Sequence, residues 1–413
     1  MDSLPPSLHH AFENIKYHAK DILSAISGCV CQPQSRLKIN GRMFKIVKLL
    51  GEGGFSFVYL AQDEASGKEF ALKKIRCLTG AEGVEVAMRE VAAYRRFKHP
   101  NIIRLYDSAV LQDSDGEGKI VYLFLPIYKR GNLQDAINTY TQTGERFSER
   151  HLLRLFKGTC EAVRAMHTYR SGKPSSGTSS SSPPPPGPGS DDGHEETAGF
   201  PQPEGDSEGG YSYAPGTSAP DAASVPLVSR RPLDSGDVIF DNDQDTAQNG
   251  SGELVPYVHR DLKPGNIMIA DDGVTPILMD LGSCVRARIP IENRTQALFQ
   301  QDIAAEHSTM AYRAPELFDV KTGTTLDEKV DIWSLGCVLF ALAYLHSPFE
   351  NLQTTEQGGS IAMAVLNAQY KHPTSGYSQG LKTLIDSMLK VNPEERPDIQ
   401  QVLGVAEGLL HSA

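Results

Sequence analysis

The stretch His259-Arg260-Asp261-Leu262-Lys263-Pro264-Gly265-Asn266 decides the fold of this chain. It has the pattern of a loop between two short strands, and its aspartate and asparagine lie five residues apart with a lysine between them. A further carboxylate, Asp280, stands in Met279-Asp280-Leu281-Gly282, fourteen residues after Asn266. In phosphoryl transfer, one carboxylate orients the attacking hydroxyl, while an amide oxygen and a second carboxylate hold the metal ions on the phosphates. The spacing of these groups therefore indicates phosphoryl-transfer chemistry.

The size and charge of the chain set its broad class. At 413 residues it is long enough for a two-lobed enzyme with additional segments. Of its 51 acidic and 40 basic residues, 14 acidic and 3 basic ones lie in residues 171–254, so 37 of each sign remain elsewhere. The net charge of −11 thus belongs to one segment, and the balanced remainder predicts no nucleic-acid partner.

The cysteine content and the hydropathy of the chain indicate the kind of cellular compartment in which the protein is expected. Six cysteines do not make a disulfide framework in a chain of this length, which predicts a reducing compartment. No run of eighteen apolar residues occurs, so no membrane-spanning segment is expected. The apolar residues near the N-terminus are spaced rather than continuous, which disfavours a signal peptide.

Three regions differ in composition. Residues 1–42 form an N-terminal extension, 43–410 form a catalytic body, and 171–253 interrupt that body as a low-complexity insertion. Strand-like alternation dominates the first part of the body, and helical periodicity dominates the second, which predicts an α+β fold with two lobes. The boundaries expected are an N-lobe at 43–127 and a C-lobe at 128–170 and 254–410.

The individual elements of the body are predicted from the period of the apolar residues. Strands are expected at 43–62, 69–76, 102–111, 119–125, 267–270 and 276–279. Helices are expected at 82–97, over the helical pattern that runs from 132 through 169, and at 295–305, 326–344, 359–368, 378–390 and 398–410.

The insertion is rich in serine, proline, glycine and acidic residues and poor in apolar ones. Such a segment does not offset the entropy cost of ordering its chain, so it is predicted to be disordered. A long surface loop adds little closure entropy per residue, and the body therefore tolerates it. The run Pro183 to Pro186 has the composition of a polyproline ligand for an SH3-type partner. The alternative is a solvated spacer that carries phosphorylation sites.

Further short motifs surround the first one. In Gly51-Glu52-Gly53-Gly54-Phe55-Ser56-Phe57-Val58, small residues at a strand–turn–strand let backbone amides approach phosphate oxygens. The motifs that complete the set are Ala71-Leu72-Lys73, Ala314-Pro315-Glu316, Asp331-Ile332-Trp333-Ser334-Leu335-Gly336 and Glu395-Arg396-Pro397. Each alone is weak, but their order is specific, and together they resemble the eukaryotic protein kinases. Ser56 departs from the family pattern by replacing the third glycine.

The resemblance implies a role for each matched residue of the catalytic stretch. Asp261 is the base or hydroxyl-orienting group, and Lys263 neutralises the γ-phosphate in transit. A lysine at this place favours the serine/threonine kinases. Asn266 and Asp280 are the expected ligands of Mg²⁺, with Mn²⁺ as an alternative metal.

Nucleotide binding is likewise implied for the first part of the body. Lys73 is expected to hold the α- and β-phosphates of ATP and to pair with Glu90, for which Glu85 and Glu82 are the competitors. The adjacent Lys74 leaves a one-residue ambiguity. The full set of expected ATP-binding residues is Leu50, Gly51, Gly53, Gly54, Ser56, Val58, Ala71, Lys73, Leu125 and Ile127.

The resemblance also assigns the activation segment. Thr309 is expected to hydrogen-bond toward Asp261 and Lys263. Glu316 is expected to form an ion pair with Arg396, and Asp331 to bond backbone amides of the catalytic loop. Leu281 replaces the usual Phe of D-F-G and implies altered packing beneath the helix of Glu90.

Three stretches narrow the resemblance, namely Leu125-Pro126-Ile127-Tyr128-Lys129-Arg130-Gly131, Leu278-Met279-Asp280-Leu281-Gly282-Ser283 and Gln296-Ala297-Leu298-Phe299-Gln300-Gln301-Asp302. They resemble the serine/threonine kinase 16-like branch of the Numb-associated kinase family, and the insertion suggests a fungal-type member. This branch implies a helix within the activation segment, activity without obligatory phosphorylation of that segment, and lipid-anchored attachment to membranes. The spacing of Leu298, Phe299 and Ile303 on one apolar stripe supports the helix independently.

The N-terminal extension carries a candidate membrane anchor. Gly28-Cys29-Val30-Cys31 follows apolar residues at helical spacing, which are Phe12, Ile15, Ala19, Ile22, Leu23 and Ile26. An amphipathic helix that ends in Cys29 and Cys31 fits reversible S-palmitoylation, and two acyl chains suffice for stable anchoring. The family resemblance implies attachment to Golgi or vacuolar membranes, so the expected location is the cytoplasmic side of one of these membranes. The alternative is a helix packed on the kinase body, with ordinary thiols, in a soluble cytoplasmic protein.

The sequence thus predicts an ATP- and magnesium-dependent serine/threonine protein kinase that acts on protein substrates, associated with membranes in trafficking or organelle regulation. One alternative is a pseudokinase scaffold, which degraded catalytic positions would mark. Another is an adaptor that works through the proline-rich insertion.

Overall fold

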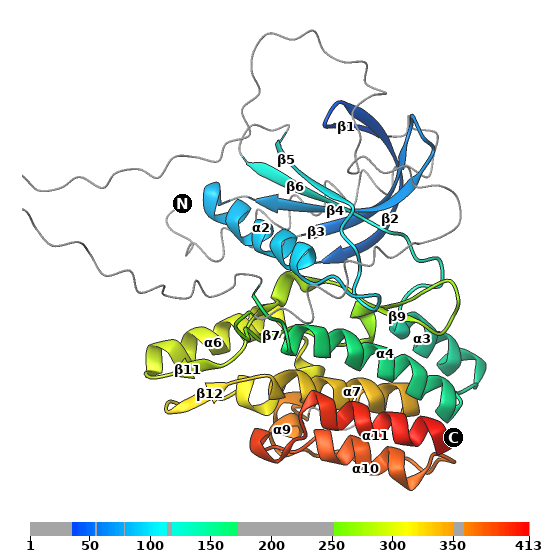
Figure 1. Cartoon of the computed structure of the whole chain (residues 1–413), viewed down its shortest axis with the longest axis vertical. Coiled ribbons are helices and arrows are strands. Elements are labelled where there is room, and N and C mark those ends of the chain that lie inside the picture. The colour runs from blue at the N-terminus through cyan, green and yellow to red at the C-terminus, as the bar shows by residue number, and fades with distance from the viewer. Residues whose placement is uncertain are drawn as a thin grey trace, which may run out of the picture.

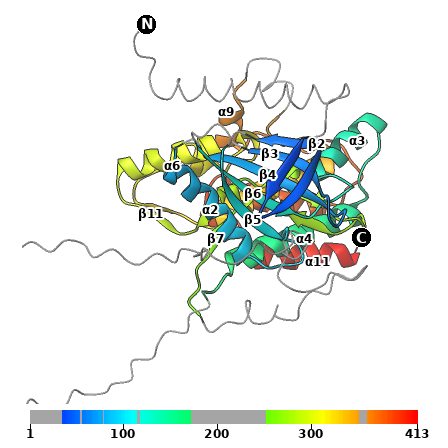
Figure 2. The same cartoon turned by 90° about the horizontal axis from the view of Figure 1, so that it is seen from above.

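The chain folds into a β-rich lobe above a helical lobe (Figure 1). The computed structural model describes residues 35–53, 56–77, 79–113, 118–171, 252–350 and 359–412. Viewed from above, the sheet lies over the helical lobe, from which α3 (Leu133–Thr143) and α6 (Arg294–His307) project on opposite sides (Figure 2). The predicted two-lobed α+β fold is therefore confirmed.

The N-lobe is built on one antiparallel sheet with the strand order β1-β2-β3-β4-β6-β5. Its strands are β1 (Arg36–Ile39), β2 (Arg42–Gly53), β3 (Ser56–Asp63), β4 (Glu69–Cys77), β5 (Asp107–Gln112) and β6 (Lys119–Leu125). Helix α2 (Ala81–Arg96) contacts β4 and β6. Successive side chains of a strand point to opposite faces, so β4 turns Ala71 and Lys73 to one face and Leu72 and Lys74 to the other.

Both faces of this sheet are apolar. On the outer face, Phe44, Phe70 and Phe124 pack together with ring centroids 5.1 to 6.4 Å apart. On the inner face, Val121 and Leu123 join the main core of the protein, which continues into the C-lobe. Burial on both faces, together with the pairing of β4 with β3 and β6, fixes the place of the strand that carries Lys73.

The C-lobe packs its helices around α7 (Lys329–Tyr344), whose residues from Val330 to Tyr344 are all buried. A helix that is apolar on every side belongs in the centre of a core. Helices α3, α4 (Glu149–His167) and α10 (Gln379–Met388) contact α7, and α11 (Ile399–Ser412) packs on α4 and α10. The other helices of the lobe are α6 and α9 (Ile361–Leu366). Short strand pairs complete the lobe: β7 (Tyr257–Val258) with β10 (Val285–Arg286), β8 (Ile267–Ile269) with β9 (Pro276–Leu278), and β11 (Ile289–Ile291) with β12 (Thr324–Leu326).

The two ends of the predicted insertion lie side by side. Arg170 and Leu254 form an antiparallel bridge, and the backbone N–H of Ser171 donates to the carbonyl of Glu253 at 2.9 Å. Residues 172–251, with Pro183 to Pro186, lie outside the described residues. The body is therefore closed at the base of this segment by a hydrogen-bonded stem.

The structure corrects several expected boundaries. The sheet begins at Arg36, inside the region assigned to the N-terminal extension, because β1 pairs with the start of β2. Residues 102–106 are not a strand: Ile102 bridges Leu278 instead, so the chain crosses to the C-lobe before β5 begins. The helical pattern from 132 to 169 is broken at Gly144, whose positive φ of 73° ends α3, and α4 starts anew after the N-cap Ser148.

The predicted helix of the activation segment is present as α6, but its apolar stripe does not face the core. Ala297, Gln300 and Ala304 are its buried residues, whereas Leu298 and Phe299 are 47% and 61% exposed. The small alanine side chains allow α6 to lie close to the lobe, and the larger side chains are left at the surface.

Candidate active site

The catalytic loop is held from below by one buried carboxylate. Asp331, on α7, accepts hydrogen bonds from the backbone N–H groups of His259 at 2.8 Å and Arg260 at 3.0 Å. His167, at the end of α4, contacts the same carboxylate at 3.0 Å. Arg260 has a positive φ of 67°, a strained conformation for a residue with a side chain. The two backbone contacts to Asp331 fix this turn, which presents the next residue, Asp261.

Asp261 is surrounded by hydrogen-bonding partners from the loop and from the activation segment. The side-chain amide of Asn266 donates to its Oδ2 at 3.0 Å and to its carbonyl at 2.8 Å. Thr309 donates to Oδ1 through its backbone N–H at 2.9 Å and its hydroxyl at 2.8 Å. Lys263 Nζ lies 2.8 Å from Asp261 and donates to the Thr309 hydroxyl at 2.7 Å. Thr309 thus makes both contacts that the family resemblance implies.

Lys73 lies between two carboxylates that come from different lobes. Its Nζ donates to Glu90 Oε1 at 2.7 Å and to Asp280 Oδ1 at 2.8 Å. Glu90 projects from α2, and Asp280 follows β9. The competing Glu85 pairs instead with the exposed Arg89, one turn away on the same helix. Lys73 and Glu90 are therefore the residues of the expected ion pair.

The charges of this cluster reinforce one another. The Lys73 ammonium lowers the pKa of Asp280 to about 2. Burial by itself lowers the pKa of Lys73, but the carboxylates of Asp280 and Glu90 outweigh burial and raise its pKa well above the ordinary value. At neutral pH Lys73 is therefore protonated and Asp280 ionised, which are the states needed for binding a phosphate and a cation.

The turn Asp280-Leu281-Gly282, the D-L-G turn, packs beneath α2. Asp280 has a left-handed backbone with φ 61°, and Leu281 is only 1% exposed. A Cβ added to Gly282 would lie 3.3 Å from Glu90 Oε2, so a side chain at that position would crowd the carboxylate that pairs with Lys73. Leu281 therefore fills the apolar position beneath α2 that the resemblance assigns to a phenylalanine.

The expected nucleotide-binding residues lie next to one another across the N-lobe sheet. Gly51 pairs with Val58, Val58 with Lys73, and Ala71 with Leu125. A Cβ added to Gly51 would meet no atom within 4 Å, so this backbone faces open space. Leu50 and Ser56 flank the same hairpin, and Ile127 follows β6. Gly54 lies outside the described residues.

Asn266 and Asp280 supply oxygen atoms suited to a hard cation such as Mg²⁺. Because the Asn266 amide nitrogen is bonded to Asp261, its oxygen points to the other side and is presented as a ligand. Within the described ranges, no three His, Cys, Asp or Glu side chains cluster as a self-sufficient metal site. This donor set therefore fits an ion that takes its remaining ligands from nucleotide phosphates and water.

The end of the activation segment is clamped to the C-lobe. Arg396, which is 2% exposed, donates from two nitrogens to the two carboxylate oxygens of Glu316 at 2.7 and 2.8 Å. Its guanidinium also lies over the ring of Trp333, 5.2 Å from the centroid. The expected ion pair is thus a bidentate one, which is the strong form of such contacts.

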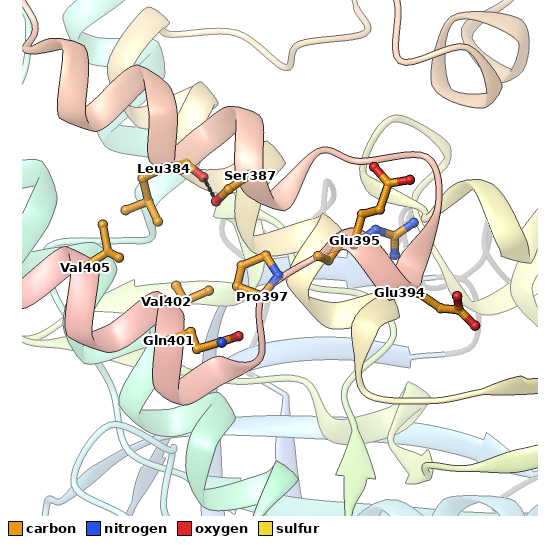
Figure 3. Close-up of a pocket in the computed structure, with 9 residues that line it drawn as sticks. Leu384, Ser387, Glu394, Glu395, Pro397, Gln401, Val402 and Val405 are labelled. Carbon is orange, nitrogen blue, oxygen red and sulfur yellow. Dashed lines mark hydrogen bonds between the residues drawn. The ribbon is translucent and has the colours of Figure 1, made fainter.

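A surface hollow of about 470 Å³ lies between α10 and α11 (Figure 3). Its lining includes Leu384, Val402, Val405, Glu394 and Glu395. Arg396 lines it as well, but Lys73, Asp261 and Asp280 do not, so the hollow is separate from the catalytic cluster.

Two residues near the site were not predicted from the sequence. His167 contacts Asp331, and Tyr94 accepts a hydrogen bond from the D-L-G turn at 3.4 Å. Tyr94 stands four residues after Glu90, one helical turn further along the same face, so a helical wheel drawn on α2 would have marked it. His167 lies at the end of α4 without any comparable signal.

The candidate acylation residues, Cys29 and Cys31, lie outside the described residues. The cysteines that the structure describes are all free thiols, namely Cys77, Cys160, Cys284 and Cys337. In the part of the chain that the structure describes, no helix combines the length and the apolar character required to cross a bilayer.

Comparison with known proteins agrees with this geometry. The protein kinase domain family matches residues 44–171 and 256–405, so the match breaks where the insertion was predicted. Serine/threonine-protein kinase ppk13 of Schizosaccharomyces pombe is 32% identical over 407 residues, covering 98% of this chain and 95% of the relative. Serine/threonine-protein kinase ENV7 of Saccharomyces cerevisiae is 32% identical, with 92% and 96% covered. Human serine/threonine-protein kinase 16 is 31% identical, with 92% and 94% covered. The chain therefore belongs to the protein kinase family, in the branch of serine/threonine-protein kinase 16 and its fungal relatives.

Proposed function

We propose that this protein transfers the γ-phosphoryl group of ATP to serine and threonine hydroxyls of proteins. The observation that carries the proposal is the position of Lys73, 2.7 Å from Glu90 and 2.8 Å from Asp280. In protein kinases, this lysine–glutamate pair and the aspartate of the D-F-G motif must both be in place for activity. A pseudokinase is disfavoured because Asp261 and Asn266 are present as well and are hydrogen-bonded to each other.

The residues divide the work as follows. The Lys73 ammonium binds phosphate oxygens of the nucleotide, and Glu90 keeps that ammonium in place. Asp261 accepts the hydrogen bond of the substrate hydroxyl and orients its oxygen toward the γ-phosphate. Lys263, held by Asp261 and Thr309, places a second positive charge where negative charge develops during transfer. Thr309 connects this group to the activation segment, so the folded segment adds two hydrogen bonds to Asp261.

Asn266 and Asp280 would hold the divalent cation, Mg²⁺ or Mn²⁺. When bound there, the cation would supply positive charge that offsets the charge of the phosphates. The pKa of Asp280, about 2, keeps its carboxylate ionised at every physiological pH. Asn266 contributes a neutral oxygen whose orientation is set by Asp261.

Incubation of the purified protein with γ-labelled ATP, Mg²⁺ and a generic protein substrate tests the proposal. We expect label on serine and threonine of the substrate and of the protein itself. Absence of label with both Mg²⁺ and Mn²⁺ would contradict the assignment and favour the pseudokinase alternative.

The insertion is expected to be dispensable for phosphoryl transfer. Ser171 and Glu253 are already hydrogen-bonded across the stem at 2.9 Å, so replacing residues 172–252 by Asn-Gly closes it with a two-residue hairpin turn. We expect kcat/KM toward a generic substrate to stay within about twofold of the wild type, since loop length contributes little to stability.

The same deletion variant is tested in parallel for binding of SH3-type partners. This measurement distinguishes the adaptor hypothesis from the spacer hypothesis. Loss of a partner with intact turnover supports an adaptor role for the insertion. A large loss of turnover contradicts the expectation of a dispensable segment.

We also propose that Cys29 and Cys31 anchor the protein to the cytoplasmic side of an endomembrane through reversible acylation, in keeping with a role in trafficking or organelle regulation. The support is the amphipathic pattern that precedes them. Replacing both by serine is expected to move the protein from the membrane fraction to the soluble one, without change in kinase activity. Cys77→Ser, at a buried thiol, is the control. Unchanged pelleting of the double variant discards the anchor and leaves the soluble alternative.

A further inference from the structure

Helix α6 carries its largest apolar side chains on the face turned away from the protein. Phe299 is 61% exposed, more than any other large apolar side chain in the described part of the chain, and its neighbour Leu298 is 47% exposed. The opposite face packs on the lobe through Ala297, Gln300 and Ala304, and α6 lies at the edge of the C-lobe (Figure 2). Single exposed apolar residues are ordinary, but bulky neighbours on one helix face mark a candidate interaction surface.

Charges of opposite sign flank this apolar centre along the helix. Arg294, Leu298, Asp302 and Glu306 follow one another at intervals of four residues, and residues at this spacing form one ridge on the helix surface. The three charged side chains are exposed, and neither Arg294 nor Asp302 forms an ion pair with any other described residue. The exposed face of α6 therefore presents a cation at its start, apolar side chains in its middle and carboxylates at its end.

A second copy of the helix, running antiparallel to the first, complements every part of this face. Around a two-fold axis that passes between Leu298 and Phe299, the residues of the two copies face one another in reverse order. The apolar side chains of the two copies then pack together, and Arg294 of each copy lies near Asp302 of the other. A uniformly basic partner would instead face Arg294 with like charge, and an anionic membrane surface would face Asp302 and Glu306 with like charge.

The length of α6 limits the strength of such a pairing. Its 14 residues span about 20 Å, so two helices in contact bury less than the roughly 1,600 Å² of a standard interface. Exposed ion pairs add little affinity, but they fix which way the two helices run. We therefore expect a reversible association in the micromolar range rather than a permanent dimer.

We propose that the face of α6 formed by Arg294, Leu298, Phe299 and Asp302 is a self-association surface, on which a second copy of this chain docks as an antiparallel, two-fold partner. Such pairing goes beyond the proposed kinase activity and does not depend on it. Because α6 belongs to the activation segment, the pairing places the activation segments of two copies side by side.

Sedimentation velocity of the full-length protein under reducing conditions measures the pairing. Over about 1–200 µM, the wild type should convert from monomer to dimer. Phe299→Ser should raise the dimer Kd at least about tenfold, because it removes the aromatic group at the centre of the interface. Val405→Ser, at another exposed apolar side chain, on α11, is the control, and its Kd should stay within about twofold of the wild type. Both positions are exposed, so the thermal unfolding midpoints should remain close to that of the wild type.

Exchanging the charges tests the antiparallel arrangement itself. In a dimer of Arg294→Glu, a carboxylate faces Asp302 at both ends, and in a dimer of Asp302→Lys, two cations face each other at both ends. Each variant alone should dimerise about tenfold more weakly than the wild type. An equal mixture of the two should recover a Kd within about threefold of the wild type, because the introduced charges then face each other at one end and the native pair forms at the other.

A wild type that stays monomeric over this range would overturn the self-association surface. So would a dimer that survives Phe299→Ser, or a mixture that is no tighter than its two components. Binding of a monomeric wild type to vesicles that contain phosphatidylserine, lost in Phe299→Ser, would assign the face to a membrane instead. Because none of these measurements uses turnover, a dimer without phosphoryl transfer would count against the kinase assignment alone.

Discussion

Asp280→Ala is expected to lower kcat/KM for phosphoryl transfer by about 10³-fold while leaving the protein folded. The substitution removes an ionised carboxylate that contacts Lys73 at 2.8 Å and is one of the two expected cation ligands. Its side chain is 43% exposed, so no large cavity forms. Lys73 keeps its contact with Glu90, and nucleotide binding should weaken far less than turnover. Labelled-ATP transfer with matched protein concentrations and a nucleotide-binding titration measure the two effects.

Asp319→Ala is the matched control for this experiment. Asp319 forms an ion pair with Lys321 in which both side chains are more than 60% exposed, and such pairs contribute little. Its kcat/KM should equal that of the wild type. A residual activity of Asp280→Ala within about tenfold of the wild type would show that this carboxylate does not hold a catalytic cation.

Asp331→Ala is expected to destabilise the protein by about 3–5 kcal/mol. The side chain is fully buried and accepts bonds from two backbone amides and from His167. Without it, the amides of His259 and Arg260 lose their acceptors in a place that water does not reach. The thermal unfolding midpoint should be lower by roughly 5–10 °C. The urea concentration at the unfolding midpoint should be lower as well. Asp331→Asn keeps one acceptor oxygen, so its unfolding midpoint should lie between those of the wild type and Asp331→Ala.

The same variant has an expected pH signature. Burial raises the pKa of Asp331, but the bonds from His167 and the His259 amide outweigh it and hold the folded-state pKa below the ordinary value. A carboxyl whose pKa is lowered by folding stabilises the folded protein at pH values above its pKa in the unfolded chain, which is about 3.9. This contribution is lost as the pH falls through the pKa of the carboxyl in the folded protein. The stability gap between wild type and Asp331→Ala should therefore narrow below about pH 4. A gap that is constant down to pH 2 would mean that the carboxylate contributes no charge-dependent stability.

Local pattern was sufficient to identify most of the site. The order of the motifs around Asp261 and Asp280 carried the family resemblance, which implied the kinase fold, and the change from strand-like to helical periodicity predicted the two lobes. The period-two alternation of β4 separates Lys73 from Lys74 once Ala71 is known to face inward. A helix at 295–305 was also predicted and is present as α6 (Arg294–His307), since helical periodicity is a local property.

Contacts between distant segments were not accessible in the same way. The periodicity placed Leu298 and Phe299 on one apolar stripe of the predicted helix. It does not determine which face of the helix packs on the core, and in the structure both side chains are exposed. The strand β1 escaped prediction because four residues carry too little periodic signal, and they are ordered by pairing with β2 and by the burial of Ile39 among the aromatic side chains of the outer face. The choice of Glu90 over Glu85 came from the spacing of the family motifs. The structure shows the partner of each glutamate: Glu90 pairs with Lys73, and Glu85 pairs with Arg89.

By itself, the sequence determined which chemical groups this protein carries and in what order, and hence that it is a kinase of two lobes. The family resemblance implied some distant pairs, such as Glu316 with Arg396. Only the tertiary structure decided others: Lys73 with Asp280 across 207 positions, and Tyr94 with Leu281 across 187. The physical reason is that residue type and spacing are written along the chain, whereas the partner of a buried charge or amide is set by burial that distant segments create together.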